Sequence, residues 1–193
     1  MNAPEILAAI GPIVEALEEL GVAYHIGGSV ASSVHGIPRL TIDADIVADL
    51  QLEHVRPLVK QLEAEYYIDA DVVREAIRRH SSFNAIHLDT ILKFTVFIPK
   101  TRPFDQEEFR RIRQEVLAEG TRPFYTASPE GTILNKLEWY RMGGEVSDRQ
   151  WNDILGVLKV QGTALDMAYM QRWAKVLRVT DLLEKALVEA GIS

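Results

Sequence analysis

The chain has 193 residues, enough for one good-sized core or for one domain with a small helical companion. Apolar residues make up 47% of it and charged residues 25%, which are values of a globular protein rather than a disordered one. With 28 acidic against 21 basic residues, the formal charge of −7 argues against a surface coated with positive charge for non-specific nucleic-acid binding. The absence of cysteine excludes disulfides, cysteine–zinc sites and thiol catalysis, and it favours a reducing compartment.

No apolar run approaches the roughly 18 residues that a membrane span needs, so we expect no membrane association. No Lys or Arg precedes Arg39, so the N-terminus lacks the positive segment of a secretory signal, and we expect a cytoplasmic protein. Charge is uneven, because residues 1–60 carry eight carboxylates and three basic residues, whereas residues 74–113 carry nine basic and five acidic ones. These two stretches are either two walls of one cleft or ordinary solvated helix faces.

Apolar periodicity predicts alternating helices and strands in the first two thirds of the chain. Pro12 either kinks the first helix or marks a later start, Gly21 is expected to end it, and Ser29 is expected to cap the second helix. The predicted elements are helices at 3–20, 29–36, 52–66, 69–79 and 105–119, and strands at 22–26, 42–50, 83–89 and 93–98.

Beyond about residue 125 the pattern is helical throughout. Ser128-Pro129 and the capping box of Ser147 and Gln150 begin two helices, and two more follow near 165–177 and 180–190. Trp139, Trp151 and Trp173 are most simply the core of this bundle. The fold class is therefore α+β, a mixed sheet with flanking helices in residues 1–125 followed by a helical bundle in residues 126–193.

The chemistry is concentrated between Tyr24 and Leu50. A strand leads into Gly27-Gly28-Ser29, a helix begins, and the next strand carries Asp43 and Asp45 on one face. Two adjacent carboxylates repel each other unless a cation lies between them, and Mg²⁺ is the cation that prefers such oxygen ligands. The glycines let the backbone approach a phosphate closely, and a helix N-terminus offers free N–H groups to it. Together these features predict a nucleotide–Mg²⁺ site.

This segment resembles the nucleotidyltransferase superfamily of polymerase-beta type. The pattern is carried by Gly28-Ser29, a thirteen-residue spacer that ends in the typical run Arg39-Leu40-Thr41-Ile42, and Asp43-Ala44-Asp45-Ile46. The later stretch from Ser128 to Gly162 is similar to the small bacterial and archaeal branch related to AbiE-type (AbiEii) toxins.

The resemblance implies a role for each residue of the pattern. Gly27, Gly28 and Ser29 would hold the β- and γ-phosphates of a nucleoside triphosphate, with Arg39 and Thr41 beside them. Asp43 and Asp45 would bind two Mg²⁺ ions. Lys136 is a candidate contact to the triphosphate, with an exposed helix lysine as the alternative. The acceptor would be a hydroxyl of tRNA or of a protein, and an antitoxin protein is a possible partner.

One position departs from the family pattern. The family places a third carboxylate in a Lys-x-Asp-apolar-Phe run, and here Lys93-Phe94-Thr95-Val96-Phe97 has threonine at that place. Thr95 is uncharged and cannot act as a base near neutral pH. Asp89 could substitute across the predicted turn, or it could be a turn carboxylate paired with Lys93.

Two functions follow from these residues. The first is an Mg²⁺-dependent nucleotidyltransferase, possible as a toxin of a toxin–antitoxin pair. The second is a nucleotide-binding module in which Thr95 has impaired the transfer reaction. Arg74, Arg78, Arg79 and His80 would serve the end of a helix in either case, or contact phosphate or an RNA backbone.

Overall fold

The computed structural model describes residues 3–39, 41, 43–117 and 122–192, with side chains from residue 6 onward. The chain divides into two compact units. The sheet unit comprises Met1–Gly27 and Leu40–Thr126, and the helical unit comprises Gly28–Arg39 and Ala127–Ser193. The sequence-based division at residues 125 and 126 assigned residues 28–39 to the first domain, whereas in the compact units they group with the C-terminal helices.

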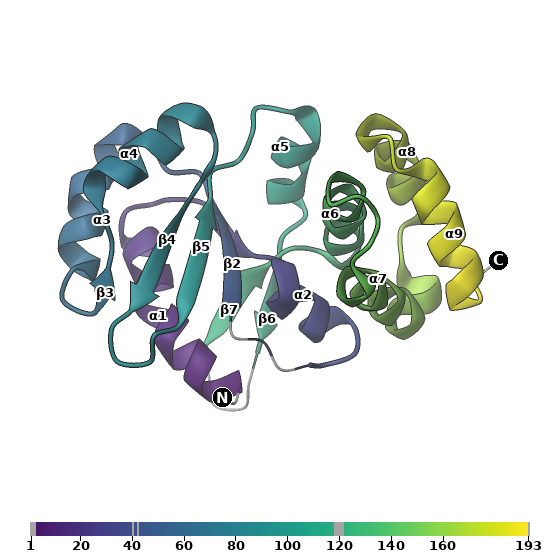
Figure 1. Cartoon of the computed structure of the whole chain (residues 1–193), viewed down its shortest axis with the longest axis horizontal. Helices are drawn as coiled ribbons and strands as arrows, with labels where there is room; N and C mark the ends of the chain where they lie inside the picture. The colour runs from purple at the N-terminus through teal and green to yellow at the C-terminus, as the bar shows by residue number, and fades with distance from the viewer. Residues whose placement is uncertain (1–2, 40, 42, 118–121, 193) are drawn as a thin grey trace. The chain divides into compact units, whose positions relative to one another are not determined.

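The sheet unit is built on a mixed sheet, in agreement with the predicted α+β class (Figure 1). Within the described residues the sheet has seven strands in the order β3-β4-β5-β2-β1-β7-β6. The pairs β2–β5 and β1–β7 are parallel and the other neighbouring pairs are antiparallel. The strands are β1 Tyr24–Ile26, β2 Asp43–Ala48, β3 Tyr66–Tyr67, β4 Ser82–His87, β5 Lys93–Phe97, β6 Arg113–Val116 and β7 Pro123–Thr126.

Helices α1, α3 and α4 cover the apolar face of this sheet, and the 3-10 turn η1 leads into α3 (Figure 1). Helix α1 passes through Pro12 without interruption. It ends at Gly21, whose φ of +67° favours glycine, and the N–H of Val22 donates to the Leu17 carbonyl at 2.9 Å, as expected for a glycine-capped helix end. The bounds are α1 Ala3–Glu19, η1 Leu52–His54, α3 Val55–Leu62, α4 Ala70–Arg79 and α5 Pro103–Arg110.

The predicted helix at 105–119 is wrong in its second half. Helix α5 ends at Arg110, and β6 then pairs antiparallel with β7 at the edge of the sheet. Local charge and spacing favour a helix here, but pairing with β7 satisfies the backbone of β6 and leaves its charged side chains at a sheet edge, where charge is well tolerated. Residues 118 and 119 of the predicted helix lie outside the described residues.

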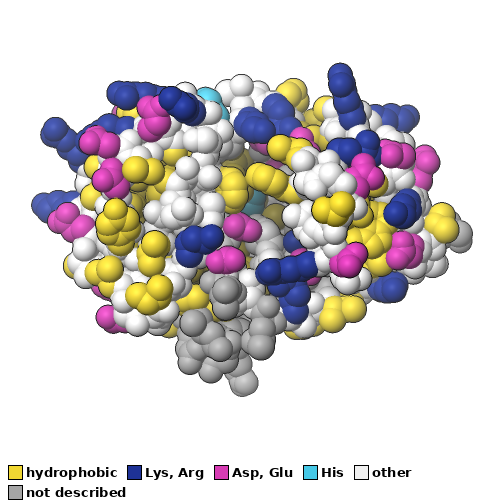
Figure 2. Space-filling model, in the orientation of Figure 1, with side chains coloured by type: hydrophobic (Ala, Val, Ile, Leu, Met, Phe, Trp, Pro, Cys, Tyr) yellow, Lys and Arg dark blue, Asp and Glu magenta, His cyan; other side chains and the backbone are white. Residues whose placement is uncertain are grey.

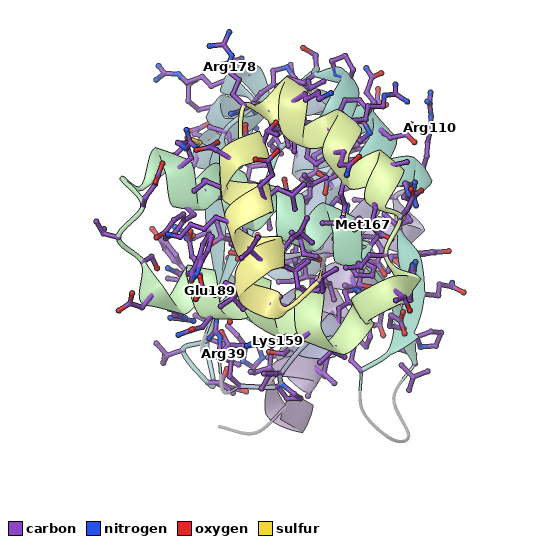
Figure 3. The ribbon with its side chains drawn as sticks, turned by 90° about the vertical axis from the view of Figure 1, so that its right-hand side faces the viewer. Arg39, Arg110, Lys159, Met167, Arg178 and Glu189 are labelled. Atoms are coloured by element: carbon purple, nitrogen blue, oxygen red, sulfur yellow. The ribbon has the colours of Figure 1, made fainter. Side chains whose placement is uncertain are left out.

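The helical unit consists of α2 and the C-terminal helices, and the four predicted C-terminal helices are confirmed. Figure 3 looks onto α8 and α9, with Met167 at the start of α8 and Glu189 near the end of α9. The bounds are α2 Gly28–His35, α6 Pro129–Met142, α7 Asp148–Gln161, η2 Gly162–Ala164, α8 Met167–Leu177 and α9 Thr180–Ala190.

Helix α2 belongs with these helices because it packs directly on α7. A Cβ atom added to Gly36 would lie 2.7 Å from the backbone nitrogen of Val157, so only glycine allows the close approach. The imidazole Nε2 of His35 lies 2.7 Å from the Ala127 carbonyl, and the Gln161 amide donates to the His35 carbonyl at 2.7 Å. The sequence could not show these contacts, since they join residues about 90 to 126 positions apart.

The tryptophan prediction holds for two of three positions. Trp151 and Trp173 are buried, but Trp139 is 48% exposed. Helix α6 buries Ile133, Leu137 and Tyr140, which share one face, and Trp139 falls on another. Among the described residues, no helix is long and apolar enough to cross a membrane.

Candidate functional site

The aspartate pair lies on β2 as predicted. Asp43 and Asp45 are half-buried and alternate with the buried Ala44 and Ile46, so both carboxylates project from the same face. The backbone fixes this segment at two points, since the Gly27 N–H donates to the Asp45 carbonyl and the Thr41 hydroxyl donates to the Asp43 carbonyl, each at 2.9 Å. The structure therefore assigns Thr41 a contact with the backbone of the pair.

The neighbouring strand β5 brings a lysine and a threonine beside this pair. In the parallel register, Lys93 is opposite Asp43 and Thr95 is opposite Asp45. The Lys93 ammonium lies 3.8 Å from Asp43 Oδ1. The Thr95 hydroxyl donates to Asn84 Oδ1 on β4 at 3.2 Å. The position where the resemblance implies a third carboxylate thus holds a neutral pair, Thr95 and Asn84, directly beside Asp45.

Asp89 is not brought to the pair. It is exposed in the turn between β4 and β5, and the ammonium of Lys93 lies beside Asp43 rather than beside this turn. In the part of the chain that the structure describes, no three His, Cys, Asp or Glu side chains form a group that could hold a metal ion. The oxygen donors at hand are the two carboxylates with the Thr95 hydroxyl and the Asn84 amide, a hard set that suits Mg²⁺ completed by substrate oxygens.

The helical unit holds a second charged cluster, centred on Asp153 of α7. Asp153 is buried and accepts hydrogen bonds from Arg39 at 2.7 and 2.8 Å and from Lys136 Nζ at 2.8 Å. Burial raises the pKa of Asp153, but the hydrogen bonds from Arg39 and Lys136 outweigh it and lower the pKa below its ordinary value. The alternative of Lys136 as an exposed helix lysine is wrong, because its side chain is only 10% exposed.

Ser29 joins this cluster through its hydroxyl. It is the second residue of α2 and not its cap, because the helix already begins at Gly28, whose φ of +55° turns the chain one residue earlier. The Ser29 hydroxyl accepts from Arg39 at 2.6 Å and from Arg149 at 3.5 Å. Arg39 lies at the lower edge of this unit in Figure 3.

The cluster carries net positive charge at the start of a helix. Three cations, Arg39, Lys136 and Arg149, face one carboxylate, Asp153, which leaves a charge of +2. Together with the N–H groups at the start of α2, this surplus suits an anion with several negative charges, such as a phosphate chain. The sequence reasoning identified Ser29, Arg39 and Lys136 but missed Asp153 and Arg149. Asp153 was detectable as a lone carboxylate among Trp151, Ile154 and Leu155 on the apolar face of a helix.

A buried histidine lies on the same face of the sheet as the aspartates. His25 on β1 is opposite Val47 of β2, which shares the face of Asp43 and Asp45. Its ring packs edge-on against Phe109 at 5.1 Å between centroids, and neither ring nitrogen has a hydrogen-bond partner. Burial lowers the pKa of His25 to about 4, so the ring is neutral near pH 7. A ring so enclosed supports the sheet and is closed to solvent.

The basic side chains near the end of α4 serve the helix itself. Arg74 pairs with Asp71 and Arg79 with Glu75, both within α4. Figure 2 shows acidic and basic side chains mixed over the face in view, with no broad field of one sign. This distribution agrees with solvated helix faces.

Comparison with known proteins extends to structure alone. No protein-family profile and no curated protein matches the sequence. A crystal structure of ANT(2")-Ia in complex with adenylyl-2"-tobramycin is 14% identical, with a TM-score of 0.60, over 90% of this chain and 97% of that chain. An antigenic nucleotidyltransferase-like protein from Paracoccidioides brasiliensis is 16% identical, with a TM-score of 0.59, over 100% of this chain and 96% of that one.

A lincomycin-bound structure of the lincosamide antibiotic adenylyltransferase LnuA is 13% identical, with a TM-score of 0.51, over 79% of this chain and 96% of that chain. At such low identity these similarities concern the fold. The mixed sheet with its helices is the fold of nucleotidyltransferases.

Proposed function

We propose that this chain is a nucleotidyltransferase, which moves a nucleoside monophosphate from a nucleoside triphosphate to an oxygen of an acceptor and releases pyrophosphate. The observation that carries the proposal is the pair Asp43 and Asp45, held on one face of β2 at backbone positions fixed by Gly27 and Thr41. The fold supports it, because the structures with which it is shared include two antibiotic adenylyltransferases.

Asp43 and Asp45 would hold two Mg²⁺ ions, which when bound supply charge neutralisation at the α-phosphate. The aspartates provide four carboxylate oxygens on one face, and Lys93 adds a positive charge beside Asp43. Charge stabilisation and positioning supply most of the rate in phosphoryl transfer, so few other groups are needed.

The phosphates of the nucleotide would be bound by the cluster around Ser29. Gly27 and Gly28 leave the backbone open, the Ser29 hydroxyl and the N–H groups of α2 offer donors, and Arg39 and Lys136 supply charge. Asp153 acts through these two cations, since it fixes both side chains in place.

A titration with a non-hydrolysable nucleoside triphosphate in the presence of Mg²⁺ tests the proposal. Asp43→Asn should weaken binding by at least about tenfold, because a carboxylate that holds the cation becomes neutral. Asp49→Asn is the matched control, since Asp49 lies exposed just beyond the end of β2. Equal affinity for the native protein and a folded Asp43→Asn variant would refute this site.

The pair of Thr95 and Asn84 favours a second candidate, a nucleotide-binding module that does not transfer. Tight Mg²⁺-dependent binding without pyrophosphate release from any acceptor would support the module. Transfer to a hydroxyl of tRNA or of a protein, the role of a toxin and the antitoxin partner stay predictions from the resemblance.

A further inference from the structure

We propose that the acceptor is a phosphate group, either inorganic phosphate or a phosphate monoester, and not a neutral hydroxyl. The inference rests on the proposed nucleotidyltransferase function and names the class of its second substrate. Its starting point is the neutral pair of Thr95 and Asn84 beside Asp45.

A hydroxyl acceptor has to lose its proton as it attacks, and a positioned general base takes that proton. At the place directly beside Asp45 the side chain is Thr95, whose hydroxyl donates its own hydrogen to Asn84. Neither side chain accepts a proton near neutral pH. Across the described ranges, no further His, Cys, Asp or Glu joins the aspartate pair to form a metal-binding group, so none takes over from Thr95.

A phosphate monoester does not need this help, because it is already ionised near pH 7. One of its oxygens forms a bond to the α-phosphorus of the nucleoside triphosphate. The bond from that phosphorus to the bridging oxygen of the β-phosphate breaks, and pyrophosphate leaves with the electron pair. No proton moves, and the product holds a new phosphate–phosphate linkage.

The charge balance of the sheet face agrees with an anionic acceptor. A threonine where a carboxylate would stand makes the face more positive by one charge. Lys93 precedes Thr95 by two residues on β5, so its ammonium projects from the same face and is about half exposed. An incoming anion therefore meets a neutral pair and a cation, where a third carboxylate would repel it.

Inorganic phosphate labelled with ³²P is the simplest acceptor of this class. With unlabelled ATP, Mg²⁺ and the full chain, we expect label to appear in the β-phosphate of ADP together with an equal amount of pyrophosphate. Hydrolysis of ATP cannot place label there. Ribose 5-phosphate against ribose, and glucose 1-phosphate against glucose, offered with [α-³²P]ATP, extend the test to organic acceptors, and only the phosphorylated member of each pair should be labelled.

Two matched variants test the role of position 95. Thr95→Asp should lower transfer to phosphate by about tenfold or more and raise transfer to a hydroxyl, because it restores a base and repels an anion. Thr95→Asn has nearly the same shape without the charge, and it should keep the native preference. A binding titration of ribose 5-phosphate, with and without Mg²⁺, gives a readout besides activity, and its affinity should fall in Thr95→Asp and in Lys93→Gln.

The outcomes separate this inference from the proposed function. Nucleotide binding with transfer to hydroxyl compounds only, or with no transfer to phosphate or to either phosphate ester, overturns the phosphate acceptor and leaves the nucleotide site intact. The absence of any Mg²⁺-dependent nucleotide binding overturns both.

Discussion

Asp153 is the residue whose replacement should cost the helical unit most. Asp153→Asn keeps the volume but turns an amide group toward donors, so Arg39 and Lys136 lose their shared counter-charge. Removal of one partner from a buried ion pair costs about 3–5 kcal/mol. The side chain of Arg39 is 25% exposed and solvent screens part of its charge, so we expect the free energy of unfolding to fall by about 3 kcal/mol.

Urea-induced unfolding followed by far-ultraviolet circular dichroism measures this loss. Asp148→Asn, in the exposed first turn of the same helix, is the matched control and should cost less than about 1 kcal/mol. The pKa of Asp153 is lowered on folding, so its stabilisation is present above the ordinary value of 3.8 and is lost as pH falls through the folded pKa. The difference between native protein and variant should therefore vanish well below pH 3.8. A difference within about 0.5 kcal/mol at pH 7 would refute the assignment of Asp153 as the hub of the cluster.

Two further predictions concern stability. The pKa of His25 falls from 6.5 to about 4 on folding, so between these values the unfolded state binds the proton and the native protein should lose about 3 kcal/mol on acidification, whereas His25→Leu should lose much less; a parallel pH series of urea midpoints compares them, and identical slopes would contradict the burial argument. Gly36→Ala should lower the unfolding free energy by about 1–3 kcal/mol because its Cβ would meet the backbone of Val157, whereas Gly11→Ala, with nothing within 4 Å, should be neutral or stabilising; thermal melts of both show whether the close approach of α2 and α7 is real.

The parts of the fold that local pattern determines were predictable. The alternation of Ala44 and Ile46 with Asp43 and Asp45 places the carboxylates on one face whatever the neighbouring strands are. The seven-strand order and the pairing of β6 depend on contacts between distant segments, and for this reason a locally helical charge pattern at 105–119 gave the wrong element.

The candidate site shows the same limit. Glycine, serine and two aspartates at the right spacing pointed to a nucleotide, yet the neighbours of Thr95 and of Lys136 depend on strand register and helix packing. Sequence could not tell whether Asp89 reaches the pair, because the length of the turn and the register of β5 decide it.

Charge counted along the sequence proved a poor guide to where charge acts. Several basic residues of the stretch 74–113 pair with carboxylates of their own helices, as Arg79 does with Glu75 and Arg102 with Asp105, and exposed pairs of this kind contribute little. The cations that converge on one buried carboxylate, Arg39 and Lys136, lie outside that stretch, about a hundred residues apart in the chain. A protein of charge −7 can therefore present a compact positive cluster, because convergence on a shared partner, and not the regional balance, concentrates positive charge where an anion would bind.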